Sequence, residues 1–224
     1  MLNKLLVATA LVFVVPALGM AGGRATFQGS SPQTHQSTTM HIVWEDENTL
    51  RMEVGSDAYM IVRDGKAYTV TMRGNKPVVM EMGGMMKMMG AIAKQANKSK
   101  QTPFRKPDEI KATGRTDTVA GIEGQVYVIN MTDANGNQKT QEVVLTDEPV
   151  VVEMTRSYMN AIGTMFNAQG PVNFWKSLPA EQQGLLRSGD DFYVTEIEAT
   201  DPPDELFELP AKPMSLGSMF GGAF

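Results

Sequence analysis

Six methionines within ten residues are the most unusual chemical feature of the chain. Thioether sulfur is a soft ligand that suits Cu(I), and the methionine side chain is also a flexible apolar group that fills irregular packing gaps. In a helix, residues four apart lie one turn from each other on the same face. The cluster therefore permits a packed helix, a helix that contacts an apolar ligand, or a Cu(I) site. Its members are Met80, Met82, Met85, Met86, Met88 and Met89.

Other side chains that carry chemistry are scarce. The chain has no Cys, which excludes a disulfide, a thiol nucleophile and a thiolate metal site. Its two histidines, His35 and His41, lie far upstream of the methionine cluster and are expected at solvated positions. The sequence contains no nucleophile elbow, no zinc-binding histidine pair and no phosphate loop. It therefore predicts a non-catalytic protein, and it assigns no catalytic residue, no metal ligand and no cofactor.

The first 21 residues have the order of a secretory signal peptide. Lys4 precedes an apolar run, Leu5–Val15, and the small residues Gly19 and Ala21 precede the expected cleavage point. The run is too short to span a bilayer, and no later apolar run in the mature chain is long enough to do so. With 20 basic and 25 acidic side chains, the composition also disfavours a nucleic-acid partner. We expect residues 1–21 to be removed and the mature chain to be periplasmic.

Alternation of apolar and polar residues predicts an antiparallel sheet. Between residues 38 and 82 the alternation recurs five times, and Asp64-Gly65 is a strong hairpin signal because both turn positions require positive φ. These strands should form a meander with one apolar face that includes Met40, Trp44 and Met52. The expected strands cover 38–45, 50–54, 58–63, 66–72, 77–82, 109–118, 124–132, 138–145, 149–154 and 191–199.

Three other segments carry a helical period. They are the methionine-rich stretch 82–98, the stretch 158–166 and the stretch 179–187. Strands and helices together predict an α+β domain over residues 38–212. On either side of it, residues 22–37 are expected to be a flexible arm, with at most a short edge strand, and residues 213–224 a flexible tail.

Two short motifs resemble an exported bacterial family known as domain of unknown function 4412. The first is Val119–Ile129 (VAGIEGQVYVI), and the second is the closing motif Pro203–Pro210 (PDELFELP). The resemblance covers roughly residues 38–212, and the family is related to the LolA/LolB-type periplasmic lipoprotein carriers. It implies a strongly curved antiparallel half-barrel whose concave face is covered by two or three helices. It transfers no catalytic motif to this chain.

The function expected from these features is binding of an apolar ligand in a groove that the helices cover. The ligand would be a lipid, an acyl chain or a lipoprotein-like partner such as an acylated peptide, and the methionine-rich helix would be the mobile cover. The alternatives are a methionine-rich periplasmic copper-binding protein and a structural or sensory module without a ligand. The expected ligand-binding residues are Met82, Met85, Met86, Met89, Ile92, Tyr158, Ile162, Phe166 and Trp44.

Overall fold

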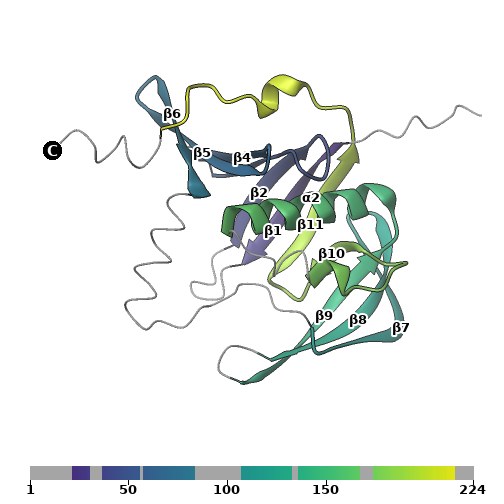
Figure 1. The fold of residues 1–224 in the computed structure, drawn as a ribbon. Coiled ribbons are helices and arrows are strands. Elements are labelled where there is room, and N and C mark those ends of the chain that lie inside the picture. The colour runs from purple at the N-terminus through teal and green to yellow at the C-terminus, as the bar shows by residue number, and fades with distance from the viewer. Residues whose placement is uncertain are drawn as a thin grey trace, which may run out of the picture.

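The fold is built on one antiparallel sheet of eleven strands in the order β6-β5-β4-β3-β2-β1-β11-β10-β9-β8-β7 (Figure 1). The computed structural model describes residues 22–30, 37–55, 58–83, 107–132, 136–166 and 174–214. Within them, the terminal strands β6 and β7 do not pair with each other, so the sheet is open. The strands are β1 (Gly23–Ser30), β2 (Ser37–Trp44), β3 (Leu50–Val54), β4 (Ala58–Arg63), β5 (Lys66–Arg73), β6 (Lys76–Glu81), β7 (Glu109–Val119), β8 (Ile122–Thr132), β9 (Gln138–Thr146), β10 (Gly184–Ser188) and β11 (Phe192–Ala199).

The predicted meander is confirmed as strands β2 to β6. Each strand pairs with the next, and the turn between β4 and β5 has positive φ at both Asp64 (53°) and Gly65 (68°). This is the turn geometry that an Asp-Gly pair favours, because it matches the twist of the flanking strands. The short turns fix the register, so residues far apart in sequence lie in continuous rows across the sheet.

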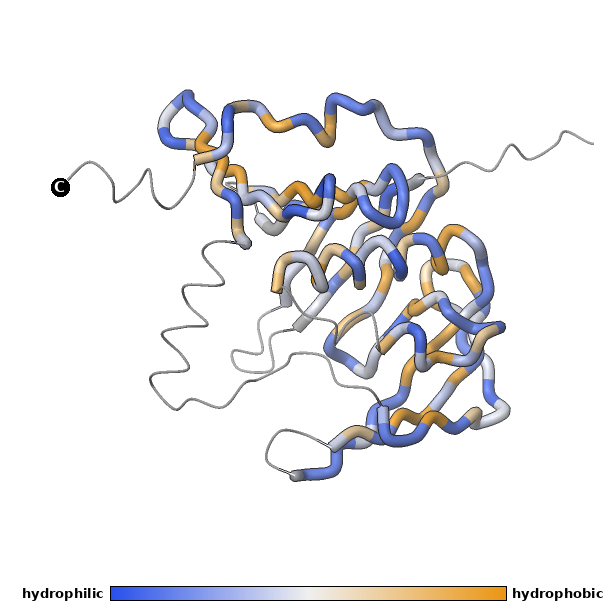
Figure 2. Tube along the Cα trace, viewed as in Figure 1, coloured by the Kyte–Doolittle hydropathy of each residue, from blue (hydrophilic) through white to orange (hydrophobic). Residues whose placement is uncertain are grey.

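One long helix, α2 (Pro149–Phe166), packs on the concave side of the sheet. It contacts strands on both halves of the sheet, from β10 and β11 through β1 to β3, β4 and β5, and the sheet curves around it in Figure 1. The apolar stripe on α2 includes Met154, Ile162 and Met165, and it meets buried strand residues such as Phe27 and Trp44. Figure 2 shows apolar stretches along α2 and the strands and hydrophilic residues at many turns. The helix therefore supplies the core that holds the sheet in its curved form.

A short helical turn, residues 174–176, covers a second apolar cluster on strands β8, β9 and β10. Phe174 and Leu178 pack there against Tyr127, Leu145 and Met159. Two or three helices were predicted. The described residues contain α2 as their one long α-helix, this turn and the 3-10 turn η1 (Asp204–Phe207), and residues 82–83 are helical. The remainder of the predicted methionine-rich helix lies outside the described residues.

A segment that we name the C-terminal strap, residues 200–214, crosses the opposite, convex face of the sheet (Figure 1). Arg51 donates a hydrogen bond to the carbonyl oxygen of Leu206 (3.3 Å), and Arg63 donates one to that of Phe207 (3.1 Å). Phe207 is buried, with 2% of its surface exposed. At the end of the strap, the backbone N–H of Met214 donates to the carbonyl oxygen of Val79 (2.8 Å) on the edge strand β6. The strap thus covers one face of the sheet and part of one edge.

The prediction of a flexible arm over residues 22–37 is wrong for Gly23–Ser30. These residues form β1, which lies in the interior of the sheet and pairs along its whole length with β2 and along most of it with β11. Ala25 and Phe27 alternate towards the core, and Phe27 is fully buried. The segment has few large apolar residues, and composition alone therefore predicted no regular structure. Its position between two strands nevertheless buries Ala25 and Phe27.

Two predicted elements have the wrong type. Residues 149–154, predicted as a strand from their β-branched run, form the first turns of α2, because this places Val151 and Met154 in the core beside Ile162. Residues 179–187, predicted as a helix, end in strand β10, where Leu185 and Leu186 are both buried on opposite sides of the chain. In both cases tertiary packing overrides local propensity.

The strap yields a prediction about stability. Replacing Phe207 by Ala removes a fully buried aromatic ring and should lower the free energy of unfolding by about 3–5 kcal/mol. Met72, which is 54% exposed on β5, is the matched control, and its replacement by Ala should cost less than about 1 kcal/mol. Urea unfolding followed by circular dichroism measures both. A cost below about 1 kcal/mol for Phe207→Ala would show that the strap does not hold the sheet.

Candidate functional site

The register of the meander gathers methionines on the face of the sheet that carries α2. Met52 lies directly opposite Met60, Met60 lies opposite Thr69, and Thr69 lies opposite Met80, which makes one continuous row across β3, β4, β5 and β6. Side chains in paired positions of adjacent strands point to the same face. We name this surface the methionine face and define it as Met40, Met52, Met60, Met80 and Met82.

On the side of the sheet that carries α2, burial changes from one row of side chains to the next. The row that contains Trp44, Leu50 and Val62 is covered almost completely, with exposed fractions of 0%, 1% and 3%. In the adjacent row Met52 is buried, whereas Met60 and Met80 are half-buried. Asn160 of α2 donates a hydrogen bond to the carbonyl oxygen of Glu47 (3.0 Å), in the turn beside the first row. The helix therefore covers the first row more completely than the second, and the methionine face is the partly accessible margin of the core.

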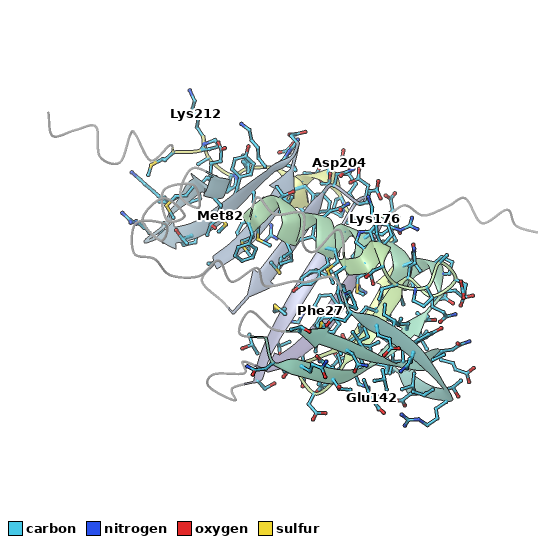
Figure 3. All side chains as sticks on the ribbon, turned by 60° about the horizontal axis from the view of Figure 1, so that its bottom comes forward. Phe27, Met82, Glu142, Lys176, Asp204 and Lys212 are labelled. Atoms are coloured by element: carbon cyan, nitrogen blue, oxygen red, sulfur yellow. The ribbon has the colours of Figure 1, made fainter. Side chains whose placement is uncertain are left out.

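The structure brings five of the predicted site residues to this region, in different environments. Trp44 is fully buried and its indole Nε1 has no hydrogen-bond partner, and Ile162 is also buried, with 8% of its surface exposed. Met82 is half-buried and packs against the same core cluster (Figure 3). Tyr158 is half-buried, whereas Phe166, the last residue of α2, is 44% exposed. Trp44 and Ile162 thus belong to the packed core, and the other three lie nearer to solvent.

Tyr158 is the centre of an aromatic group that joins α2 to the middle of the sheet. Its ring lies edge-on to Phe27 of β1 at 5.7 Å between centroids, and it is stacked with Phe192 of β11 at 6.4 Å. Burial raises the pKa of the Tyr158 phenol above its ordinary value. The phenol is therefore neutral at physiological pH, and the group remains uncharged.

The other predicted residues of the site lie outside the described residues. They are Met85, Met86, Met89 and Ile92. The predicted arm residue His35 lies outside them as well, whereas His41 is exposed on β2, as expected, with its Nδ1 3.1 Å from the hydroxyl of Thr26. Within the part of the chain that the structure describes, no group of three or more His, Asp or Glu side chains could hold a metal ion.

Comparisons with known proteins give little support for a family. No family model matches the chain, and no curated protein matches it, so the resemblance to domain of unknown function 4412 stays a prediction. Among solved structures, a LolA superfamily protein from Nitrosomonas europaea matches 86% of this chain and 92% of its own length, with 7% sequence identity and a TM-score of 0.30. A TM-score of that size does not establish a common fold. None of the helices in the described ranges is long and apolar enough to cross a membrane.

The methionine face as a whole was not predicted, although a signal for it exists in the sequence. Met40 and Met52 were expected on the apolar face, and Met60 and Met80 occupy the matching alternate positions of the next hairpins. Counting paired positions through the short turns would have placed all four on one face. Met80 and Met82 belong both to this face and to the dense methionine cluster, but the density of the cluster along the chain gives no information about the register.

The burial of Tyr158 predicts a specific pH dependence of stability. Up to about pH 10 the phenol is neutral in both the folded and the unfolded chain; above that pH the unfolded chain ionises first, because the folded-state pKa is raised. The free energy of unfolding should therefore fall with rising pH by up to about 1.4 kcal/mol per pH unit from this group. Urea unfolding between pH 8 and 11 should give a smaller fall for Tyr158→Phe than for the wild type. Equal slopes would contradict the burial of the phenol.

Proposed function

We propose that the protein is a non-catalytic binder of an apolar ligand in the bacterial envelope. The ligand class is a lipid or an acyl chain, either free or attached to a peptide, and the binding surface is the methionine face beside α2. The observation that carries the proposal is the continuity of this face with the core: it is apolar, it is partly accessible, and it adjoins the last turn of the helix. Export to the periplasm, indicated by the sequence of residues 1–21, belongs to the same proposal.

The chemistry of the face suits an acyl chain. Along the row Met52, Met60, Thr69 and Met80 no side chain is charged, so an apolar chain placed there displaces no strongly bound water. Burial of apolar surface contributes roughly 25 cal/mol per Å². Unbranched thioether side chains rearrange readily, which lets one surface accept chains of different length and saturation.

The described residues divide into two roles under this proposal. Met60, Met80 and Met82, which are half-buried, and the exposed Phe166 would contact the ligand, and Tyr158 would close the inner end of the surface. Trp44 and Ile162 would act only as the packed core beside it, because both are buried. Contact by Met85, Met86, Met89 and Ile92 stays a prediction from the sequence.

A charge-insertion experiment tests the surface. The double variant Met60→Lys/Phe166→Lys places two ammonium groups where the acyl chain would lie, each costly to remove from water, and should weaken binding of a fluorescent fatty-acid analogue at least about 10-fold. The control is Met72→Lys, at an exposed apolar position on β5, which should bind the probe as the wild type does. Unchanged affinity in the double variant, with native strand content by circular dichroism, would contradict the proposal.

A second set of variants separates packing chemistry from metal chemistry. Replacing Met40, Met60, Met80 and Met82 together by Leu removes every accessible thioether of the face but keeps its apolar character and nearly its volume. Probe affinity should change less than about threefold if the face binds an acyl chain. If instead the wild type takes up Cu(I) under anaerobic reducing titration and this variant does not, the surface is a copper site.

A further inference from the structure

The start of the central strand β1 lies against a carboxylate on α2. The backbone N–H of Gly22 donates to Glu153 Oε2 at 3.3 Å, across 131 positions of sequence. Gly22 is buried and Glu153 is half-buried. Within the described residues Glu153 takes part in no ion pair, although it is a charged group partly removed from water. Among the described residues, its hydrogen-bond partner is the backbone nitrogen just before β1.

Position 22 accepts only glycine in this place. An added Cβ would lie 2.9 Å from the carbonyl oxygen of Trp44 and 3.1 Å from Cδ of Pro202, and this clash is the same before and after removal of residue 21. The carbonyl oxygen of Gly22 is held as well, because the N–H of Thr200 donates to it at 3.3 Å. The nitrogen of Gly22 is thus fixed in position beside Glu153 by the packing around it.

The same nitrogen is the atom that removal of a signal peptide after Ala21 would change. Hydrolysis of the Ala21–Gly22 bond by an envelope peptidase adds one water: the hydroxyl goes to the Ala21 carbonyl carbon, and the proton goes to the Gly22 nitrogen. The released amine, with an ordinary pKa of about 8, takes up a further proton at neutral pH. A neutral amide donor becomes an ammonium group with three donors, beside an ionised carboxylate.

We infer that cleavage between Ala21 and Gly22, which rests on the proposed export, creates an ion pair between the new N-terminal ammonium group and Glu153, so that the residue before β1 is tied to α2 by a charge pair only in the processed chain. Before cleavage the carboxylate accepts from a neutral amide; after cleavage it faces a full positive charge, which adds Coulomb attraction to the hydrogen bond. The site does not depend on the proposed ligand. Glu153 would then act in maturation of the chain. Glycine is required directly after the cleavage point because a side chain there would clash with its surroundings.

The test begins with the full-length chain exported in a bacterial host. N-terminal sequencing of the purified envelope protein should read Gly-Gly-Arg-Ala, which is the sequence from Gly22. A mature chain that begins at any other residue would overturn the inference, because its ammonium group would not lie beside Glu153.

The second measurement compares two chains that contain every described residue, one that begins at Gly22 and one that begins at Gly19. Both can be released from a cleavable fusion without added residues. In the longer chain Gly22 keeps its amide, and the ammonium group moves away by up to about 10 Å. The chain from Gly22 should melt about 2–4 °C higher, as expected for one such interaction in a domain of this size. Equal melting temperatures would overturn the inference.

A pair of charge variants assigns the difference to Glu153. In Glu153→Gln the two chain lengths should melt within about 1 °C of each other, whereas Glu47→Gln, which removes an exposed carboxylate in the β2–β3 turn, should keep the full difference. A difference that persists in Glu153→Gln would mean that chain length, and not the ion pair, causes it. If Glu153→Gln folds poorly, the comparison of the two wild-type chains still stands, and equal melting temperatures there would overturn the inference.

Discussion

An open sheet has no closure of its own to keep it curved, so its shape depends on what fills the concave side. In the described part of the chain this is α2, and the decisive contact is the aromatic group in which Tyr158 meets Phe27 and Phe192. Phe27 is fully buried on the central strand, and Phe192 is on the strand beside it. Through these rings one helix side chain joins the strands at which the two halves of the sheet meet.

This arrangement determines where a ligand surface can exist. The sheet is wider than one helix can cover, so the row of Trp44 and Leu50 is buried while the row of Met60 and Met80 is not. On the convex side the C-terminal strap takes the place of a second layer, held by Phe207 and by two arginines.

The two edges of the sheet also differ. At one edge Met214 pairs with β6, and at the other the register of β7 shifts between Ala112 and Thr116. A local irregularity of this kind discourages pairing with another chain.

The hairpins were the most predictable part of the fold, because turn pairs such as Asp64-Gly65 and strict alternation act over a few residues. Errors arose where long-range packing decides. β1 is ordered by β2 and β11, and the β-branched start of α2 is helical because Val151 belongs to the same core as Ile162. Of the residues that the proposed function places at the ligand surface, Tyr158, Phe166 and Met82 were also predicted from the sequence. The sequence could not show that Trp44 lies in the fully covered row, because that depends on where α2 crosses the sheet.

The position of β1 has a consequence for how the chain reaches its native state. Arg24 on β1 hydrogen-bonds Glu198 on β11 across 174 positions of sequence. One side of the central strand thus has no partner until nearly all of the chain is available, and contacts between such distant residues make folding slow. Before that point the β2–β6 hairpins can form by local contacts, but the two halves of the sheet cannot join. A chain of this topology remains incompletely folded until β11 has been synthesised, because the central strand lacks one of its two neighbours before then.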